Sequence, residues 1–307
     1  MKKQVPNLFI IGAPKTGTTA LANNLAQHSE IYISKYKEPR FFDAHTFFDF
    51  EEDYPIKTLD EYLKLFNTKE SKNKKYLLDS SVFNMYSEKS IKNILEISPD
   101  AKFIVLMRDP VESSVSMHKQ RLKYPPGGMR ELSINFLECW KMLEKRKEDQ
   151  CYPKNCRNKF LFRYDLLYSY ENYIPMLKEN IKEENLFIRF YDEYRRDTNL
   201  FFDSIFKFLD IGKEEIKNEQ MNKSYILNES KVLILLNYFL KKSLNFRKRF
   251  GLSGNKRLNK VRDFIYSFYV IKSKEKNSDL SEVKSFFKNT YEYMDQIRLE
   301  NEKKNIQ

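Results

Sequence analysis

The fold class is indicated by the segment Gly12-Ala13-Pro14-Lys15-Thr16-Gly17-Thr18-Thr19, because it joins an apolar run to a helical pattern. The run Asn7 to Ala13 (NLFIIGA) is typical of a strand buried on both faces. A helix is expected to begin near Thr18, since Leu21 and Leu25 then fall four apart on one face. Backbone N–H groups at a helix start are unpaired and the helix dipole favours an anion there. The segment therefore predicts a phosphate-binding loop.

Similar units recur along the first two thirds of the chain. Further apolar runs that predict strands are Ile31 to Ile33, Tyr76 to Leu78, Phe103 to Met107 and Leu186 to Phe190. Strands that alternate with helical patterns predict an α/β fold of three layers, with a central parallel sheet flanked by helices. Strand-like runs stop at about residue 212. We therefore expect a single domain over 1–307, with a core at about 5–212 and a helical C-terminal part at 213–307.

The position of the lysine in the loop narrows the function. In the common nucleotide-triphosphatase loop the lysine follows the last glycine, whereas here Lys15 precedes Gly17 by two residues. This order argues against a kinase or ATPase. The plainer alternative is a glycine-containing turn with an incidental lysine.

A second segment is expected to reach the same anion. The strand over Phe103 to Met107 ends at Arg108, and open α/β sheets bind ligands at the carboxyl ends of their strands. Ser116 would lie about two turns into the helix that follows, so both side chains can converge on one ligand. Taken alone, Arg108-Asp109-Pro110 is also compatible with a salt-bridged arginine and an ordinary helix start.

Together the two segments resemble the signatures of sulfotransferases that use 3′-phosphoadenosine 5′-phosphosulfate (PAPS). Pro14 to Thr19 matches the family pattern P-K-[T/S]-G-[T/S]-[T/S], and Arg108 to His118 is similar to its 3′-phosphate segment. The resemblance implies the family's P-loop-like fold. It also implies that Lys15 contacts the oxygen bridging phosphorus and sulfur, and that the other donor-binding residues are Thr16, Gly17, Thr18, Thr19, Arg108 and Ser116.

A general base is expected to accept the proton of the acceptor as sulfur is attacked. The segment Lys37 to Asp43 (KEPRFFD) resembles the K-E-x-x-F-F pattern of glycan sulfotransferases, in which the glutamate is the base. By this resemblance Glu38 is the catalytic base, although a surface glutamate paired with Lys37 or Arg40 would fit the same letters. His45 and His118 are the alternative bases.

Two further groups could shape the pocket. Asp79, Ser80 and Ser81 follow a predicted strand on the Lys15 side of the sheet, where they would line the ligand crevice or cap the next helix. Tyr164 lies in a segment that resembles the family's aromatic-plus-leucine motif. The resemblance implies that Tyr164 helps to enclose the nucleotide, and core packing is the alternative.

The chain carries a net charge of +12, from 55 Lys and Arg against 43 Asp and Glu. Such a balance suits an anionic ligand, nucleic acid or a membrane surface. Aromatic residues are not interleaved with arginine as in RNA-binding signatures, so no nucleic-acid partner is expected. The basic loop 246–262 could instead touch a membrane surface. No signal-peptide core or membrane span is recognisable, and we expect a cytoplasmic protein.

These features predict an enzyme that transfers a sulfuryl group from PAPS to a hydroxyl or amine, with a saccharide or glycolipid as the favoured acceptor. Lys15, Arg108 and helix dipoles offset the donor charge, so no metal is expected. Two alternatives stay open. One is a nucleotide-dependent kinase with an irregular phosphate loop, and the other is a non-catalytic protein that binds polyanions.

Overall fold

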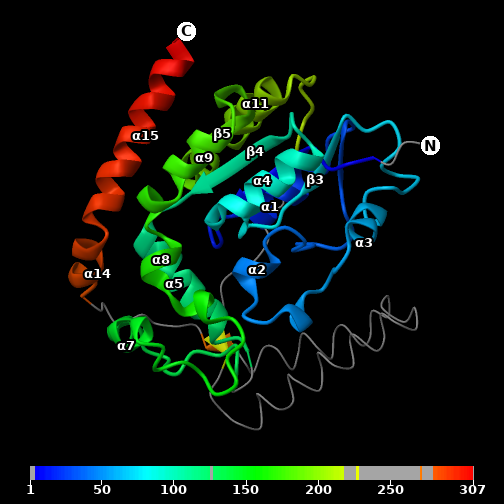
Figure 1. Cartoon of the computed structure of the whole chain (residues 1–307). Coiled ribbons are helices and arrows are strands. Elements are labelled where there is room, and N and C mark those ends of the chain that lie inside the picture. Colours follow the sequence, from blue (N-terminus) through cyan, green and yellow to red (C-terminus); the bar gives the residue numbers. More distant parts are fainter. Residues whose placement is uncertain (1–3, 125–126, 218–225, 228–269, 272–278, 307) are drawn as a thin grey trace.

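The computed structural model describes residues 4–124, 127–217, 226–227, 270–271 and 279–306. Its centre is a parallel sheet of five strands in the order β2-β3-β1-β4-β5, with helices packed around it (Figure 1). This arrangement confirms the predicted fold class. The strands are β1 (Leu8–Gly12), β2 (Ile31–Ile33), β3 (Tyr76–Asp79), β4 (Lys102–Met107) and β5 (Leu186–Phe190).

The described helices fill the connections between strands and follow the sheet. The α-helices are α1 (Thr18–Leu25), α2 (Ala44–Phe47), α3 (Leu59–Lys64), α4 (Glu88–Ile97), α5 (Pro110–Arg121), α6 (Phe136–Lys141), α7 (Leu143–Lys147), α8 (Tyr164–Leu167), α9 (Ile174–Asn180), α10 (Tyr191–Arg196), α11 (Thr198–Leu209), α14 (Ser281–Phe286) and α15 (Lys288–Ile306).

The two central strands place the site. β1 and β4 pair in parallel, with Phe9 opposite Phe103 and Ile10 opposite Ile104. From β1 the chain crosses to β2 on one side of the sheet, and from β4 it continues to β5 on the other side. Ligands bind at such a switch point, outside the carboxyl ends of the strands. Every residue of β1 is buried, as a strand covered on both faces requires.

Helix α5 begins where β4 ends, and its start is well capped. Asp109 accepts a hydrogen bond from the backbone N–H of Glu112 at 2.8 Å, and Pro110 occupies the first helical turn. The C-terminal helix α15 reaches the same point, because the Tyr291 hydroxyl donates to the Asp109 carboxylate at 2.8 Å. A helix from the end of the chain thus stabilises the start of α5.

The C-terminal part agrees with the sequence only in places. Helices α14 and α15 lie within the part at 213–307 that was expected to be helical. A short antiparallel pair, β6 (Ile226–Leu227) with β7 (Val270–Ile271), occurs where only helical structure was expected. The basic loop 246–262 lies outside the described residues.

Candidate active site

The phosphate loop connects β1 to α1 and is shaped by its own side chains. Gly17, with φ of 93°, adopts a left-handed conformation that favours glycine. A Cβ there would also lie 2.6 Å from the ring of Tyr191. The Thr16 hydroxyl donates to the Ala13 carbonyl oxygen at 2.8 Å, which fixes the turn from inside. The loop thus exposes backbone and Lys15, while the Thr16 side chain is held within the loop.

Lys15 and Arg108 meet at the carboxyl ends of β1 and β4. Arg108 Nη1 donates to the Lys15 carbonyl oxygen at 3.3 Å, although the two residues are 93 positions apart. The same guanidinium pairs with the Glu112 carboxylate at 2.8 Å and lies 4.8 Å from the ring centre of Tyr191. The two segments singled out in the sequence therefore form one structural unit.

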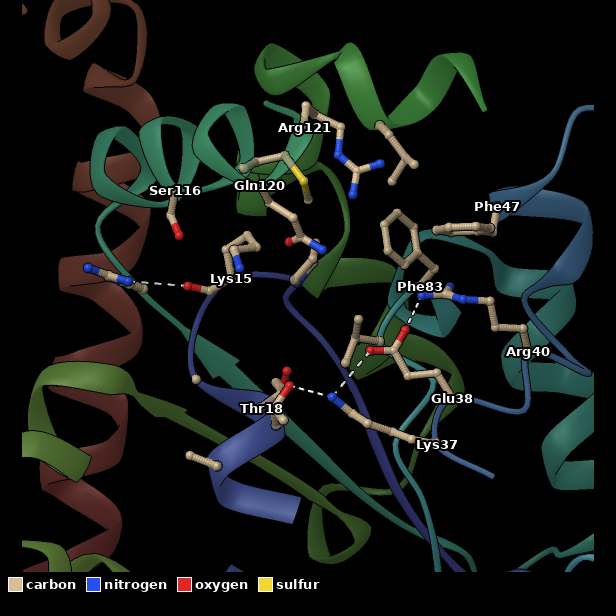
Figure 2. Close-up of a pocket in the computed structure, with 18 of the residues that line it drawn as sticks. Lys15, Thr18, Lys37, Glu38, Arg40, Phe47, Phe83, Ser116, Gln120 and Arg121 are labelled. Carbon is tan, nitrogen blue, oxygen red and sulfur yellow. Dashed lines mark hydrogen bonds and ion pairs between the residues drawn. The ribbon is translucent and has the colours of Figure 1, made fainter. Parts of the chain in front are cut away.

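A large pocket opens beside this unit, with a volume of about 1090 Å³. Figure 2 shows Lys15, Ser116 and Gln120 on one side and Glu38, Arg40 and Phe83 across from them. Glu38 is the sole carboxylate among its described lining residues. The basic residues of the lining are Lys15, Lys37, Arg40, Arg108, Arg121, Lys123 and Arg195.

This concentration of positive charge changes the chemistry of Lys15. Burial lowers the pKa of its ammonium group to about 8, and repulsion by Lys123, Arg121, Arg108 and Lys37 contributes in the same direction. A bound anion would reverse that repulsion. The pocket is therefore suited to a ligand with several negative charges.

Glu38 lies between two cations that connect it to the rest of the pocket. Its carboxylate accepts a hydrogen bond from Arg40 Nη2 and lies 3.8 Å from Lys37 Nζ. Lys37 in turn donates to the Thr19 hydroxyl at the start of α1 (Figure 2). Lys37 thus links the predicted base to the phosphate loop, a role that the sequence alone did not suggest.

Arg40 is itself held in place by buried groups. Its Nη1 lies 3.2 Å from Asp43 Oδ2, and its guanidinium stacks 3.6 Å from the ring centre of Phe47. The Ser81 hydroxyl accepts from the Arg40 backbone N–H at 3.0 Å. Burial raises the pKa of the Asp43 carboxyl to about 7, against the attraction of Arg40. The sequence offered Arg40 only as a pairing partner for Glu38, a pairing that is present, and it suggested no role for Asp43.

Tyr164 does not lie in the pocket, and its predicted role in enclosing the nucleotide is corrected. The ring is fully buried, and its hydroxyl donates to the Glu131 carboxylate. That carboxylate also accepts hydrogen bonds from both terminal nitrogens of Arg146, at 2.9 and 2.7 Å. The tyrosine belongs to a buried ion-pair network, because an interior carboxylate needs several donors.

Other predicted groups also have structural partners. Asp79 accepts from the Tyr62 hydroxyl at 2.7 Å and from the backbone N–H of Ser81 at 2.8 Å, so it stabilises the segment that carries Arg40. Asp79, Ser80 and Ser81 do not line the pocket, and the crevice alternative for them is wrong. Thr18, Thr19 and Ser116 do line it, whereas the side chain of Thr16 does not.

The histidines lie elsewhere. His45 Nε2 is 2.8 Å from the Ser87 hydroxyl, His118 Nε2 is 3.0 Å from the Ser133 carbonyl oxygen, and His28 Nε2 is 2.8 Å from the Gly212 carbonyl oxygen. None of these three lines the pocket. Of the predicted bases, only Glu38 is among the described residues that line the pocket.

A phosphate loop and a strand-end arginine at the switch point of a parallel sheet define an α/β protein that binds a phosphorylated ligand. Comparison with known families gives the particular class. Residues 5–259 match the sulfotransferase domain family model, and the chain belongs to that family. The expected family and enzyme class are confirmed.

Known relatives and structures agree with this assignment. The chain is 31% identical over 135 residues to a mouse protein named bifunctional heparan sulfate N-deacetylase/N-sulfotransferase 4. It is 29% identical over 128 residues to the membrane-associated sulfotransferase kil1 of Dictyostelium discoideum. These matches cover 44% and 40% of this chain but only 15% and 26% of the relatives. A sulfotransferase structure from Alicyclobacillus acidocaldarius shares the fold, with a TM-score of 0.61, 22% identity and coverage of 83% of this chain and 99% of that one.

Proposed function

We propose that the protein transfers a sulfuryl group from PAPS to a hydroxyl or amine of a saccharide or glycolipid. The observation that carries the proposal is the placement of Glu38 and Lys15 in one positively charged pocket, with Lys37 connecting Glu38 to Thr19 at the end of the phosphate loop. A sulfuryl transferase needs such a pair: a base for the acceptor proton and a cation for the departing phosphate oxygen.

The residues present fit a donor with phosphate groups at both ends. Gly17 permits the left-handed turn that leads into the start of α1, and Lys15 supplies a cationic group beside it. Arg108 and Ser116 would hold the 3′-phosphate, as the family resemblance implies. The donor supplies an activated sulfuryl group whose sulfur–oxygen bond breaks as the acceptor bond forms.

Each remaining part of the reaction is assigned to this chain. Glu38 would take the proton of the acceptor hydroxyl or amine, which then forms the bond to sulfur. Lys15 would stabilise the bridging oxygen as it keeps the electron pair of the broken bond. The loop N–H groups hold both partners in line, and this positioning supplies much of the rate.

The experiment that tests the proposal is calorimetric titration with adenosine 3′,5′-bisphosphate, the desulfated donor, against ATP with magnesium and adenosine 5′-monophosphate. We expect selective binding of the bisphosphate, weakened by Lys15→Ala and by Arg108→Ala. The matched control is Lys35→Ala, which removes an exposed lysine paired with Glu70 outside the pocket. A preference for ATP would support the kinase alternative and refute the proposal.

The acceptor class rests on two observations. The segment with Glu38 resembles that of glycan sulfotransferases, and the relatives include proteins named for heparan sulfate and carbohydrate sulfation. A pocket of about 1090 Å³ is large enough for a nucleotide together with part of an acceptor. Transfer of labelled sulfate from PAPS to a panel of oligosaccharides and glycolipids would test this assignment directly.

The cytoplasmic location and the membrane contact of loop 246–262 are also proposals. Within the described residues, no helix has the length and apolar character needed to cross a bilayer. Fractionation of cells, before and after replacement of the loop arginines by glutamine, would test both. If the protein is recovered in the membrane fraction and the replacement abolishes that recovery, the membrane contact is supported and a purely cytoplasmic location is contradicted.

A further inference from the structure

Arg121 is a buried cation with unmet hydrogen-bonding capacity. The residue ends α5 and is only 3% exposed. Within the described part of the chain, its Nε and Nη1 atoms meet no hydrogen-bond acceptor. Figure 2 shows the side chain projecting from α5 into the pocket, in the region of Gln120 and Phe83.

A second buried arginine shows what a purely structural role looks like in this fold. Arg146 is 2% exposed and pairs through two nitrogens with Glu131, while its Nε donates to the Cys151 carbonyl oxygen at 3.1 Å. Arginine stays charged under all ordinary conditions, and a buried donor without an acceptor is unfavourable. Arg121 therefore differs from Arg146 in that it faces a ligand pocket and has no carboxylate partner among the described residues.

The position of Arg121 separates it from the donor-binding groups. It lies five residues after Ser116 on the same helix, about 7.5 Å further along the axis and away from Arg108. Met117, Met129 and Leu161 line the pocket near this end of α5, and the ring of Tyr124 lies 4.7 Å from the guanidinium. An anion that reached Arg121 would be in a largely apolar surrounding, where a charged hydrogen bond is strong.

We propose that Arg121 determines specificity by binding a negatively charged group of the acceptor, a carboxylate or a sulfate on the saccharide. The inference rests on the proposed function and adds the charge of the acceptor to it. A guanidinium suits either group, because its donors match the oxygens of planar and tetrahedral anions. The repulsion that Arg121 and Lys123 exert on Lys15 supports the need for an anion here.

The test compares three oligosaccharides on protein saturated with adenosine 3′,5′-bisphosphate. The first alternates glucosamine with glucuronate, the second is its carboxyl-reduced twin, and the third is the reduced twin carrying O-sulfates. Calorimetry measures the Kd of each for the wild type, Arg121→Gln and Arg196→Gln. Arg196 is exposed and does not line the pocket, so its variant controls for the loss of one charge.

We expect the wild type to bind at least one charged oligosaccharide ten or more times more tightly than the neutral one. Arg121→Gln should reduce that preference to within about twofold, whereas Arg196→Gln should keep it. Arg121→Gln should still bind the bisphosphate, with an affinity lowered much less than in Arg108→Ala, because Arg121 acts on Lys15 through its charge alone.

Three results would overturn the inference. The first is a wild type that does not distinguish charged from neutral oligosaccharides or binds neither. The second is a preference for charged oligosaccharides that survives in Arg121→Gln. The third is a loss of bisphosphate binding in Arg121→Gln, which would place Arg121 in the donor site. Failure of the bisphosphate to bind wild-type protein would instead refute the proposed function, so the two failures are distinguishable.

Discussion

Arg40 Nη1 lies 3.2 Å from the buried carboxylate of Asp43, and the other end of the same guanidinium holds Glu38. Arg40 thus connects the fully buried Asp43 carboxylate to the partly exposed Glu38 carboxylate and holds Glu38 in place. The rings of Phe47 and Phe83, whose centres lie 3.6 and 4.8 Å from the guanidinium, restrict its movement further. The direction of the Glu38 carboxylate is determined by this arrangement.

Replacing Glu38 by glutamine should lower kcat by about 10² to 10⁴, the range that general-base catalysis contributes. The affinity for adenosine 3′,5′-bisphosphate should stay the same, because an amide of equal size cannot accept the proton but keeps the shape. Turnover and calorimetry check both parts, with Glu70→Gln as the surface control. Wild-type turnover in Glu38→Gln would exclude this residue as the base.

Asp43→Asn should lower kcat on the order of tenfold and remove a limb of the pH profile. The pKa of Asp43 is raised to about 7 by burial, with Arg40 opposing and Asp79 and Glu38 adding to the rise. As pH falls through 7 the carboxylate is neutralised, Arg40 loses that partner, and its charge acts on Glu38 alone. Wild-type activity should therefore fall below about pH 7.

In Asp43→Asn this limb should be absent, since the side chain no longer titrates. Rates measured between pH 5.5 and 9 at saturating donor decide the matter. An identical limb in the variant would assign the titration to another group.

Donor binding should take up protons near pH 8. The pKa of Lys15 is lowered to about 8, mainly by burial, so about half of the free protein has a neutral Lys15 at that pH. A bound anion raises the pKa of Lys15 again, so about half a proton should enter at pH 8. Calorimetry in buffers of different ionisation enthalpy measures this uptake.

The matched variant is Lys15→Arg, whose guanidinium stays charged throughout this range. It should show almost no uptake at pH 8. Uptake equal to that of the wild type would mean that another group in the pocket gains the proton.

Gly17→Ala should destabilise the loop for two separate reasons. The left-handed backbone costs about 1–2 kcal/mol for an L-residue, and overlap with the Tyr191 ring adds about 1–3 kcal/mol. Gly127→Ala is the control, because φ there is 118° but, chain neighbours aside, no atom of a described residue lies within 4 Å of the added methyl group. Thermal unfolding should show the larger loss of Tm for Gly17→Ala.

A double variant separates the two causes. Tyr191→Ala in the Gly17→Ala background should recover the part of the stability that the ring overlap removes. If the second substitution gives no recovery, the close contact with Tyr191 is not the source of the loss.

Activity should survive treatment with EDTA, because cationic side chains occupy the pocket where a kinase would bind magnesium. Initial rates with and without the chelator, and with magnesium restored, provide the measurement. Reversible loss of activity would contradict the prediction that no metal takes part.

Much of the fold could be predicted because its signals are local. Apolar runs and loop residues located β1 to β5 to within one or two residues, and the order of lysine and glycine selected the family. Partners distant in the sequence could not be read in this way. The burial of Tyr164 against Glu131 and the unpaired nitrogens of Arg121 depend on which helices meet, which no spacing reveals.

The phosphate loop and Arg108 follow two adjacent central strands, while Glu38 and the end of α5 come from connecting segments at the rim. Under the proposed function, donor binding and acceptor choice are therefore assigned to different stretches of the chain. We expect the segments at the rim to be exchangeable between family members, so that a protein can take a new acceptor while it keeps the residues that bind a common donor.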